Sequence, residues 1–471
     1  MLGFLLVEGI GMPGTAASEG EAKAVAPAAP AAPASSDYYV EPRSYGTKRE
    51  SDPPAYVRNL SATGLPGTKE LDWLDLGFEQ RSRYEYRRND LRRDEQATDN
   101  PLLLRTRAYF GIRKILDPFR FAIELQDSRR YFSQFPRDNR DVNTLEPLQA
   151  FAELYFENGL GQGRPVSIRG GRMAFELLDR RLIARNEWRN TTNSFQGVRV
   201  TLGRDQNDWS ADFFALQPLD RLKTHVDRGI EDQWFYGAVG HYRGLSKWVT
   251  LEPYWFGLVQ NGGGAAVVDR EIHTVALRAY GPAGKTGFDY DVSGLFQGGE
   301  VGARVHRAWA ATVDVGWTFD HAWKPRIGAF YGYVSGDRDP NDHQDNRFDR
   351  LFGFSRPWSS NDYIQEENVN TPKLLLAIEP WKDVKIDTAY VVYWLASGSD
   401  RWNATGLSDP TGRSGRFLGH EYNVRARFPI TSRIKANVGY AYFDPGRFPT
   451  RLGRNADSHF AYVELTVFAF E

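Results

Sequence analysis

The sequence predicts an all-β fold, a transmembrane antiparallel β-barrel of about 18 strands with short periplasmic turns and long extracellular loops. Two observations support this prediction. Polar and apolar residues alternate with a period of two in many segments that have the length of a membrane-spanning strand. The connections between these segments are alternately short and long, which is typical of an outer-membrane barrel and has no counterpart in a soluble β-sandwich.

The alternation begins after residue 70. Leu74, Leu76 and Phe78 alternate with Asp75 and Glu79, so one face of this strand is apolar and the other is charged. Residues 248–260 are less clear, because their pattern can be phased either way. The alternating texture returns along the chain at residues 102–113, 119–126, 148–157, 288–293, 309–317, 421–428, 434–440 and 463–467.

The connections between the predicted strands fall into two classes of length. Short turns are expected near residues 117–118, 203–208, 244–247, 282–285, 320–324, 381–383 and 430–432. Long loops are expected at residues 89–101, 130–146, 176–194, 219–231, 336–370, 397–418 and 444–457.

The composition excludes several other classes of protein. The 471 residues carry 59 Lys and Arg against 60 Asp and Glu, so net charge does not indicate a nucleic-acid partner. The chain has no Cys, so neither a disulfide framework nor a thiolate metal site can form. No apolar run reaches the roughly 18 residues of a membrane-spanning helix, a result that short alternating strands also give.

The texture of the sequence divides the chain into three regions. Residues 1–17, with an apolar core and a small-residue site at residues 15–18, are expected to be a truncated signal peptide. Residues 18–69 include the Pro/Ala run AVAPAAPAAPA, which favours a disordered tail or linker over a plug inside the barrel. Residues 70–471 are expected to form the barrel.

A barrel of this size has room for an aqueous channel. By the alternation, the side chains that face the lumen include Arg105, Glu153, Arg199 and Arg425. Two interpretations stay open for such residues. Opposite charges on neighbouring strands pair and stiffen the wall, or arginines in excess at the narrowest level select anions.

Residues 165–202 interrupt the alternation, which breaks at Gly170 and Gly171 and resumes only at Phe195. This stretch spans one long outer loop and the two strands that flank it, so we interpret its arginines as part of an infolded, pore-facing segment. Arg169 faces the lumen by simple alternation, whereas Arg172 does so only if the two glycines form a bulge or the chain has left the wall. The other arginines of the stretch are Arg180, Arg181, Arg185 and Arg189.

The motifs that would indicate an enzyme or a cofactor are missing from the sequence. It contains no His-Glu-x-x-His pair and no Gly-x-Ser-x-Gly elbow. Residues 281–286 resemble the end of a phosphate-binding loop but lack its first glycine, and a strand follows in place of a helix. The acidic run at residues 337–349 does not have the spacing of an EF-hand, although a calcium site in a loop stays open. We therefore expect no enzymatic activity, no cofactor, and no catalytic or metal site.

The interrupted stretch resembles the alginate export family of outer-membrane proteins. The resemblance is carried by Gly171-Arg172-Met173, Arg180-Arg181-Leu182, Trp188-Arg-Asn190-Thr-Thr and Phe195-Gln196-Gly-Val. Met173 stands where the family has Gln, and Gln196 stands where Asp is frequent. The resemblance implies an 18-stranded monomeric barrel that passes an anionic polysaccharide outward through an arginine-rich constriction, with Arg105, Glu153 and Arg172 at or near the constriction.

We therefore expect an outer-membrane channel for passive export of an anionic exopolysaccharide. The alternative is a porin for uptake or general diffusion of small anionic solutes. The expected partners are outer-membrane lipid, the anionic polymer or solute and periplasmic export proteins, without nucleic acid. The residues expected along the substrate path are Arg105, Glu153, Arg169, Arg172, Arg181, Arg185, Arg199 and Arg425.

Overall fold

The computed structural model describes residues 46–93, 97–161, 163–262 and 268–471. The expected signal peptide and the Pro/Ala run lie outside the described residues. The described residues belong to one compact unit, which contains the barrel. None of the described helices has the length and apolarity needed to span a membrane.

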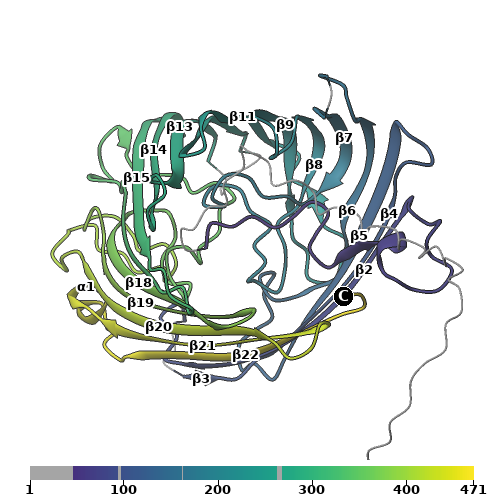
Figure 1. Cartoon of the computed structure of the whole chain (residues 1–471). Coiled ribbons are helices and arrows are strands. Elements are labelled where there is room, and N and C mark those ends of the chain that lie inside the picture. Colours follow the sequence, from purple (N-terminus) through teal and green to yellow (C-terminus); the bar gives the residue numbers. More distant parts are fainter. Residues whose placement is uncertain (1–45, 94–96, 162, 263–267) are drawn as a thin grey trace, which may run out of the picture. The chain divides into compact units, whose positions relative to one another are not determined.

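Eighteen long strands in the described part of the chain form a closed antiparallel barrel, which confirms the predicted fold class (Figure 1). Each strand pairs with its neighbour in sequence, and β2 closes the ring by pairing with β22 from Glu79–Phe468 to Arg88–His459. The strands are β2 (Leu74–Arg88), β4 (Leu102–Ile112), β5 (Phe119–Tyr131), β6 (Asn143–Phe156), β7 (Val166–Met173), β8 (Phe195–Leu202), β9 (Trp209–Asp220), β11 (Gln233–Ser246), β12 (Val249–Gln260), β13 (Arg270–Pro282), β14 (Phe288–Val301), β15 (Arg304–Thr318), β16 (Arg326–Val334), β18 (Val369–Trp381), β19 (Val384–Trp394), β20 (Phe417–Pro429), β21 (Ile434–Pro445) and β22 (Ser458–Phe468).

Four short strands and two short helices complete the described elements. Each short strand pairs near one end of a barrel strand: β1 and β3 pair with β2, β10 pairs with β9, and β17 pairs with β15. These elements are β1 (Val57–Asn59), β3 (Thr98–Asp99), β10 (Arg228–Gly229), β17 (Gln344–Asp345), the 3-10 helix η1 (Leu60–Ala62) and α1 (Arg447–Arg451).

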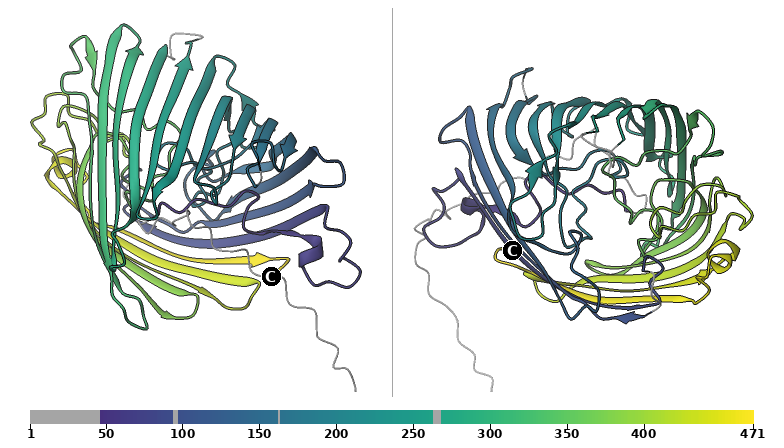
Figure 2. Two further views of the ribbon diagram at one scale, coloured as in Figure 1. Left: turned by 45° about the horizontal axis from the view of Figure 1, so that its top comes forward. Right: turned by 180° about the vertical axis from the view of Figure 1, so that it is seen from behind.

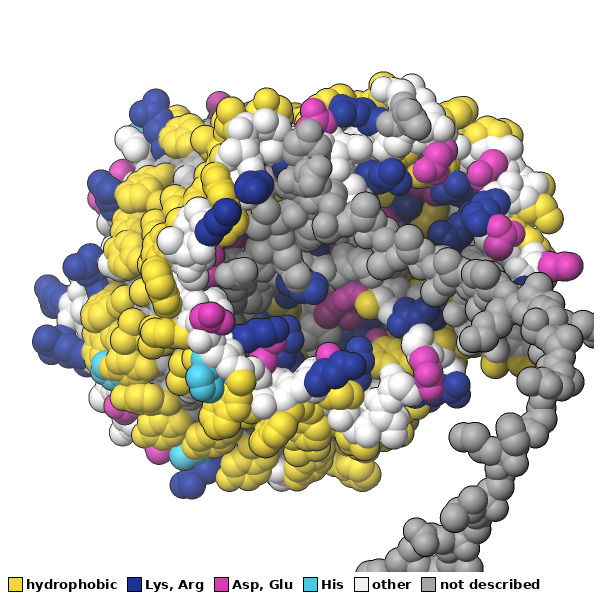
Figure 3. Space-filling model, viewed as in Figure 1, with side chains coloured by type: hydrophobic (Ala, Val, Ile, Leu, Met, Phe, Trp, Pro, Cys, Tyr) yellow, Lys and Arg dark blue, Asp and Glu magenta, His cyan; other side chains and the backbone are white. Residues whose placement is uncertain are grey.

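The two faces of each strand follow the alternation of the sequence. On β2, Phe78 and Tyr84 are 42% and 48% exposed, whereas Arg81 and Arg83 are 3% and 2% exposed on the opposite face. Figure 3 shows hydrophobic side chains gathered over the outside of the strands, as expected where a barrel faces lipid. The period of two thus places the apolar side chains toward the membrane and the charged ones inside.

Short turns gather at one end of the barrel and long loops at the other, as predicted. We call these the short-turn end and the long-loop end. One connection departs from the pattern, because β14 and β15 are joined at the long-loop end by residues 302–303 alone. Two of the long connections, residues 174–194 between β7 and β8 and residues 335–368 between β16 and β18, fold into the barrel, where Figure 2 shows segments inside the ring of strands.

The two infolded segments create an apolar core within the barrel. Leu182 and Ile183 of the first segment and Trp358 of the second are buried against inward-facing aromatic residues of the wall, including Phe235 and Phe256. This core explains why residues 248–260 have no clear phase. On β12 the inward face carries Tyr254, Phe256 and Leu258, which pack against infolded chain instead of water.

Residues 46–56 cross the interior of the barrel, and we call them the luminal strap (Figure 1). They belong to the region whose composition predicts a tail or linker. The Tyr56 hydroxyl donates to Glu124 of β5 at 2.7 Å, and Arg169 of β7 donates to Asp52 at 2.8 Å. After the strap, β1 pairs with the start of β2 through Val57 and Gly77. Polar side chains of the strap therefore find partners on the wall.

Candidate functional site

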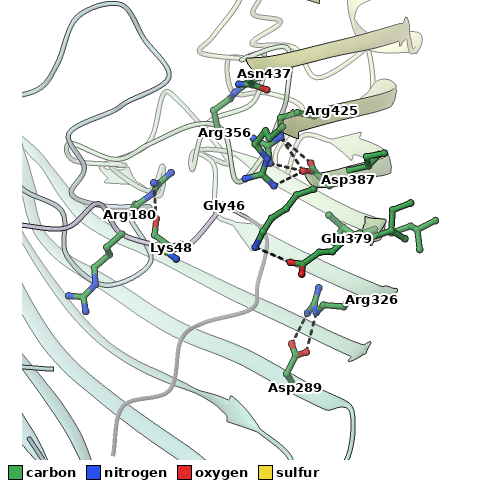
Figure 4. Close-up of a pocket in the computed structure, with 18 of the residues that line it drawn as sticks. Gly46, Lys48, Arg180, Asp289, Arg326, Arg356, Glu379, Asp387, Arg425 and Asn437 are labelled. Atoms are coloured by element: carbon green, nitrogen blue, oxygen red, sulfur yellow. Dashed lines mark hydrogen bonds and ion pairs between the residues drawn. The ribbon is translucent and has the colours of Figure 1, made fainter. Parts of the chain in front are cut away.

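A cavity of about 990 Å³ occupies the short-turn end of the barrel. Among the described residues that line it, ten are Lys or Arg and six are Asp or Glu. The strap contributes Lys48 on one side of the cavity, and Asp387 and Arg425 lie on strands at the other side (Figure 4). The lining is therefore cationic although the whole chain is nearly neutral.

Four cations near the short turns surround two carboxylates, and we call this group the mouth cluster. Arg425 and Arg427 share the Asp387 carboxylate, at 3.1 Å and 2.8 Å. Lys385 and Lys324 both approach Glu379, at 2.9 Å and 3.8 Å. The side chains of Lys324, Lys385 and Arg427 are 69%, 56% and 45% exposed, so they remain accessible to a solute.

Strand register brings the mouth cluster together. Asp387 of β19 lies directly opposite Arg425 of β20, and Lys385 lies opposite Arg427. Residues two apart on one strand share a face, so both pairs point into the barrel. Lys324 is added by the short turn between β15 and β16, which lies beside the end of β18 because the Glu379 amide donates to the Trp323 carbonyl.

Arginines on β2 and β4 anchor the first infolded segment. Arg81 and Arg83 donate to the carbonyls of residues 187 and 188, both at 2.6 Å. Arg107 donates to the Glu187 carboxylate at 2.7 Å. Arg105 bridges Glu187 and Glu79, at 3.1 Å and 2.7 Å. These wall arginines therefore hold protein groups in place.

The Glu187 carboxylate is the centre of this anchor. Burial alone would raise its pKa, but the guanidiniums of Arg107, Arg105 and Arg185 hold the pKa well below its usual range. Asn190 completes the anchor by donating to three backbone carbonyls, those of Leu104, Arg129 and Asp141, at 2.9 to 3.1 Å. The Trp-Arg-Asn-Thr-Thr motif thus has a structural role here.

Trp188 lines both the main cavity and a second cavity of about 290 Å³. The guanidinium carbons of Arg356 and Arg83 lie 3.4 Å and 3.9 Å from the centre of the indole ring. The indole nitrogen donates to Asp362 at 3.1 Å. Cation–π contacts and this hydrogen bond hold the ring in its position.

Five of the residues expected along the path form two groups. Arg105 and Arg185 meet at Glu187, and Arg185 also pairs with Glu124 at 2.7 Å. Arg169, Glu153 and Arg199 meet near the strap, with Arg169 3.1 Å from Glu153 and Arg199 3.7 Å from Asp52.

The remaining three expected residues lie apart. Arg181 pairs with Asp179 inside its own segment. Arg172 binds Glu146 and donates to the Asp227 carbonyl at 2.9 Å. The two glycines beside it form no bulge against β6, because β6 and β7 pair without a register shift, although Gly171 adopts φ +127°. Within the described part of the chain, Arg425 is the one residue of the expected set that lines the main cavity.

Several residues of the site are missing from that expected set. Lys324 and Lys385 lie beside short turns, and their positions next to predicted turns were the signal available in the sequence. Glu187 had no such signal, because its partners Arg105 and Arg107 are about eighty positions away.

No group of three metal-binding side chains occurs among the described residues. Two acids of the run at residues 337–349 pair with arginines at the ends of barrel strands. Asp337 pairs with Arg304 at 2.9 Å, and Asp349 pairs with Arg270 at 2.6 Å.

Comparison with known proteins agrees with this geometry. Residues 72–463 match the alginate export family. No curated protein sequence matches the chain. Among solved structures, OccD3 (OpdP) of Pseudomonas aeruginosa aligns with a TM-score of 0.57 at 12% identity, covering 90% of this chain and 98% of that chain. OccK8 (OprE) aligns with a TM-score of 0.56 at 14% identity, covering 84% and 98%.

A third structure, that of Pseudomonas aeruginosa OccK2 (OpdF) in complex with glucuronate, aligns with a TM-score of 0.55 at 10% identity and covers 84% of this chain and 98% of that chain. At this identity the three structures show a shared fold. The match over most of the sequence shows more: the chain belongs to the alginate export family. It is an outer-membrane β-barrel channel, and the predictions of family, location and a non-enzymatic role are confirmed.

Proposed function

We propose that this channel passively exports an anionic exopolysaccharide, which enters from the periplasm at the mouth cluster. The observation that carries the proposal is the excess of cations around the main cavity, ten Lys or Arg against six Asp or Glu among its described lining residues. In outer-membrane barrels the short turns face the periplasm. The mouth cluster therefore meets a polymer that arrives from inside the cell.

The mouth cluster is suited to weak, repeated contacts with carboxylates. Arg425 and Arg427 share one carboxylate, so a uronate can take the place of Asp387 at either guanidinium without leaving a buried charge unpaired. Lys324 and Lys385 pair with Glu379 while more than half exposed, and exposed ion pairs contribute little stability, about 0–1 kcal/mol, so exchange at these two cations costs little. A chain held in this way slides from one cation to the next.

The paired arginines deeper in the barrel have a different part in the proposal. Arg105 and Arg185 hold the infolded segment, and Arg169 and Arg199 hold the strap, so these residues shape the path without binding the polymer first. Trp188 lines both cavities, so a polymer that passes from one cavity to the other would contact it.

Single-channel recording in planar bilayers tests the proposal. Oligouronates added at the periplasmic side are expected to block the current of the unmodified channel, and neutral oligosaccharides of equal length are not. Replacing Lys324, Lys385 and Arg427 together by Gln is expected to weaken the block roughly tenfold, since three exposed charged contacts of about 0.5 kcal/mol each sum to about 1.5 kcal/mol. Arg129→Gln, on the outer face of β5, is the matched control. Equal block by neutral and acidic oligosaccharides would overturn the proposal.

The second candidate function is uptake of small anionic solutes. It is favoured by the two cavities that Trp188 lines, of about 990 Å³ and 290 Å³, a size that suits small molecules. Liposome swelling separates the two functions. Fast influx of glucuronate without block by longer oligouronates supports uptake, whereas block by the oligomers with slow influx supports export.

A further inference from the structure

We infer that the loops at the long-loop end form a binding site for a single uronate residue, a sugar ring that carries a carboxylate. The site is a cavity of about 260 Å³ beside the ends of β8 and β9, lined by Arg189, Arg221, Arg350 and Ser194. It lies apart from the main cavity and shares no lining residue with it. The inference rests on the proposed function and extends it, because it names the sugar unit that the protein would bind where the polymer leaves the barrel.

Four loops each contribute one arginine to this region. Three of the arginines line the cavity, and Arg140 lines a second cavity that also includes Arg189. Arg140 follows β5, Arg189 is in the infolded segment, Arg221 follows β9, and Arg350 is in the segment between β16 and β18. Their positions are fixed by the backbone: the Thr191 amide donates to the Arg140 carbonyl at 3.2 Å, and Arg81 donates to the Arg189 carbonyl at 2.9 Å. The cluster is therefore built by the fold.

Within the described residues these four arginines have no acidic partner, unlike the wall arginines Arg105 and Arg107. In the described part of the chain, no carboxylate oxygen lies within 4.0 Å of any of the four guanidiniums. Arg221 donates to the Asn193 amide oxygen at 3.0 Å, which is a neutral contact. Asp220, the one acid among the described lining residues, is exposed at the end of β9.

The cluster is electrostatically unfavourable when it is empty. Burial, together with the positive charges of Arg221, Arg350 and Arg140, lowers the pKa of Arg189 well below its ordinary value. Burial lowers the pKa of Arg350 as well, with a smaller contribution from Arg140, although the carboxylates of Glu367 and Asp349 oppose this shift. A bound anion relieves this repulsion, and the planar guanidinium is suited to paired hydrogen bonds with a carboxylate.

Ser194 gives independent support for a ligand and indicates that it is a sugar. Its side chain is 4% exposed, lines the cavity, and has a hydroxyl without any hydrogen-bond partner among the described residues. A buried hydroxyl without a partner is unfavourable, and a sugar hydroxyl would satisfy it. Phe195 and Phe352 add apolar surface for the face of a sugar ring.

The test is binding of glucuronate to the purified full-length channel in detergent, measured by calorimetry. Glucose probes the ring without the charge, and sulfate probes the charge without the ring. We expect glucuronate to bind, glucose to bind at least roughly tenfold more weakly, and the double variant Arg189→Gln with Arg350→Gln to lose roughly tenfold or more in affinity. Neither side chain has a hydrogen bond or ion pair in the described part of the chain, which limits the effect on folding.

Ser194→Ala and Arg413→Gln complete the set of variants. Ser194→Ala is expected to weaken glucuronate and leave sulfate unchanged, whereas Arg413→Gln, in an exposed loop, is expected to change neither. Unchanged glucuronate binding in the double variant would overturn the site. If sulfate binds as tightly as glucuronate and Ser194→Ala has no effect, the site binds an anion without recognising a sugar ring, which would contradict the inference. The calorimetry measures binding and not transport, so its result stands even if the bilayer recordings show no export.

Discussion

Glu187 and Glu366 lie on the two segments that fold into the barrel, in opposite surroundings. Glu187 is held by Arg105, Arg107 and Arg185, which keep its pKa well below the usual range. Glu366 is 3% exposed, and within the described residues neither of its oxygens has a hydrogen-bond partner. Burial and the nearby Asp179 raise the pKa of Glu366 to about 8, although Arg181 opposes them.

The difference comes from the walls behind the two residues. Strands β2 and β4 present arginines to the interior, so the first segment is attached by ion pairs and hydrogen bonds. Strands β9 to β16 also present aromatic and aliphatic residues, so the second segment is attached by apolar packing in addition to ion pairs such as Asp349 with Arg270. The same barrel therefore stabilises infolded chain in two ways, one sensitive to lost charge and one sensitive to lost volume.

The largest effect is expected from Glu187→Ala. Removing this carboxylate leaves three buried guanidiniums without a shared partner, which costs about 3–5 kcal/mol in comparable cases. Urea titration followed by tryptophan fluorescence measures the free energy of unfolding. Glu300→Ala, at an exposed position of β14, is the control. A loss no greater than that of the control would contradict the anchoring role of Glu187.

A pH effect of a few kcal/mol is expected from Glu366. The native state keeps a proton that the unfolded state releases between about pH 4.5 and 8, so the free energy of unfolding falls as pH rises through this window and levels off above it. Glu366→Leu is expected to remove this fall and to unfold at higher urea at pH 9. Identical pH profiles for the variant and the unmodified chain would show that Glu366 does not titrate in this window.

An effect of about 1 kcal/mol is expected from Ile364→Val in the second segment, because one buried methylene is lost and a small cavity remains. Ile364 belongs to the apolar core and is 2% exposed. Ile115→Val, at a turn position that is 60% exposed, supplies the comparison. If the two substitutions shift the urea midpoint equally, apolar packing stabilises the infolded chain less than the burial of these residues indicates.

The smallest effect is expected from Lys114→Ala. Its ammonium lies 2.7 Å from Asp72 in a pair whose side chains are 54% and 51% exposed. Such pairs contribute about 0–1 kcal/mol, and 1 M salt screens them further. A loss as large as that of Glu187→Ala would remove the distinction between exposed and buried ion pairs in this barrel.

Much of the fold could be predicted from the sequence, because the barrel wall follows a local rule. The alternation at Leu74 to Glu79 assigns each side chain to lipid or interior, and connections such as residues 381–383 and 397–418 sort by length. The rule fails at β12, where Tyr254 and Phe256 are apolar on the inward face. Nothing within β12 itself indicates that infolded chain covers this face.

The candidate site could be predicted only in part. Alternation places Arg105 and Arg425 inside, yet Arg105 anchors the infolded segment whereas Arg425 lines the main cavity. Their neighbours in sequence do not distinguish these roles. The partner of Arg105 is Glu187, which comes from a loop eighty-two positions later in the chain.

The sequence by itself determined the barrel, the face on which each strand residue lies, and the family, because strand pairing and lipid contact depend on the period of two and on local motifs. Only the tertiary structure decided which interior charges are paired with other charges of the protein. Coulomb energy depends on distance, and distances across the lumen are set by how residues 46–56, 174–194 and 335–368 fold inward. The same residue type thus became an anchor at Arg107, part of the mouth cluster at Arg427, and an arginine without an acidic partner at Arg189.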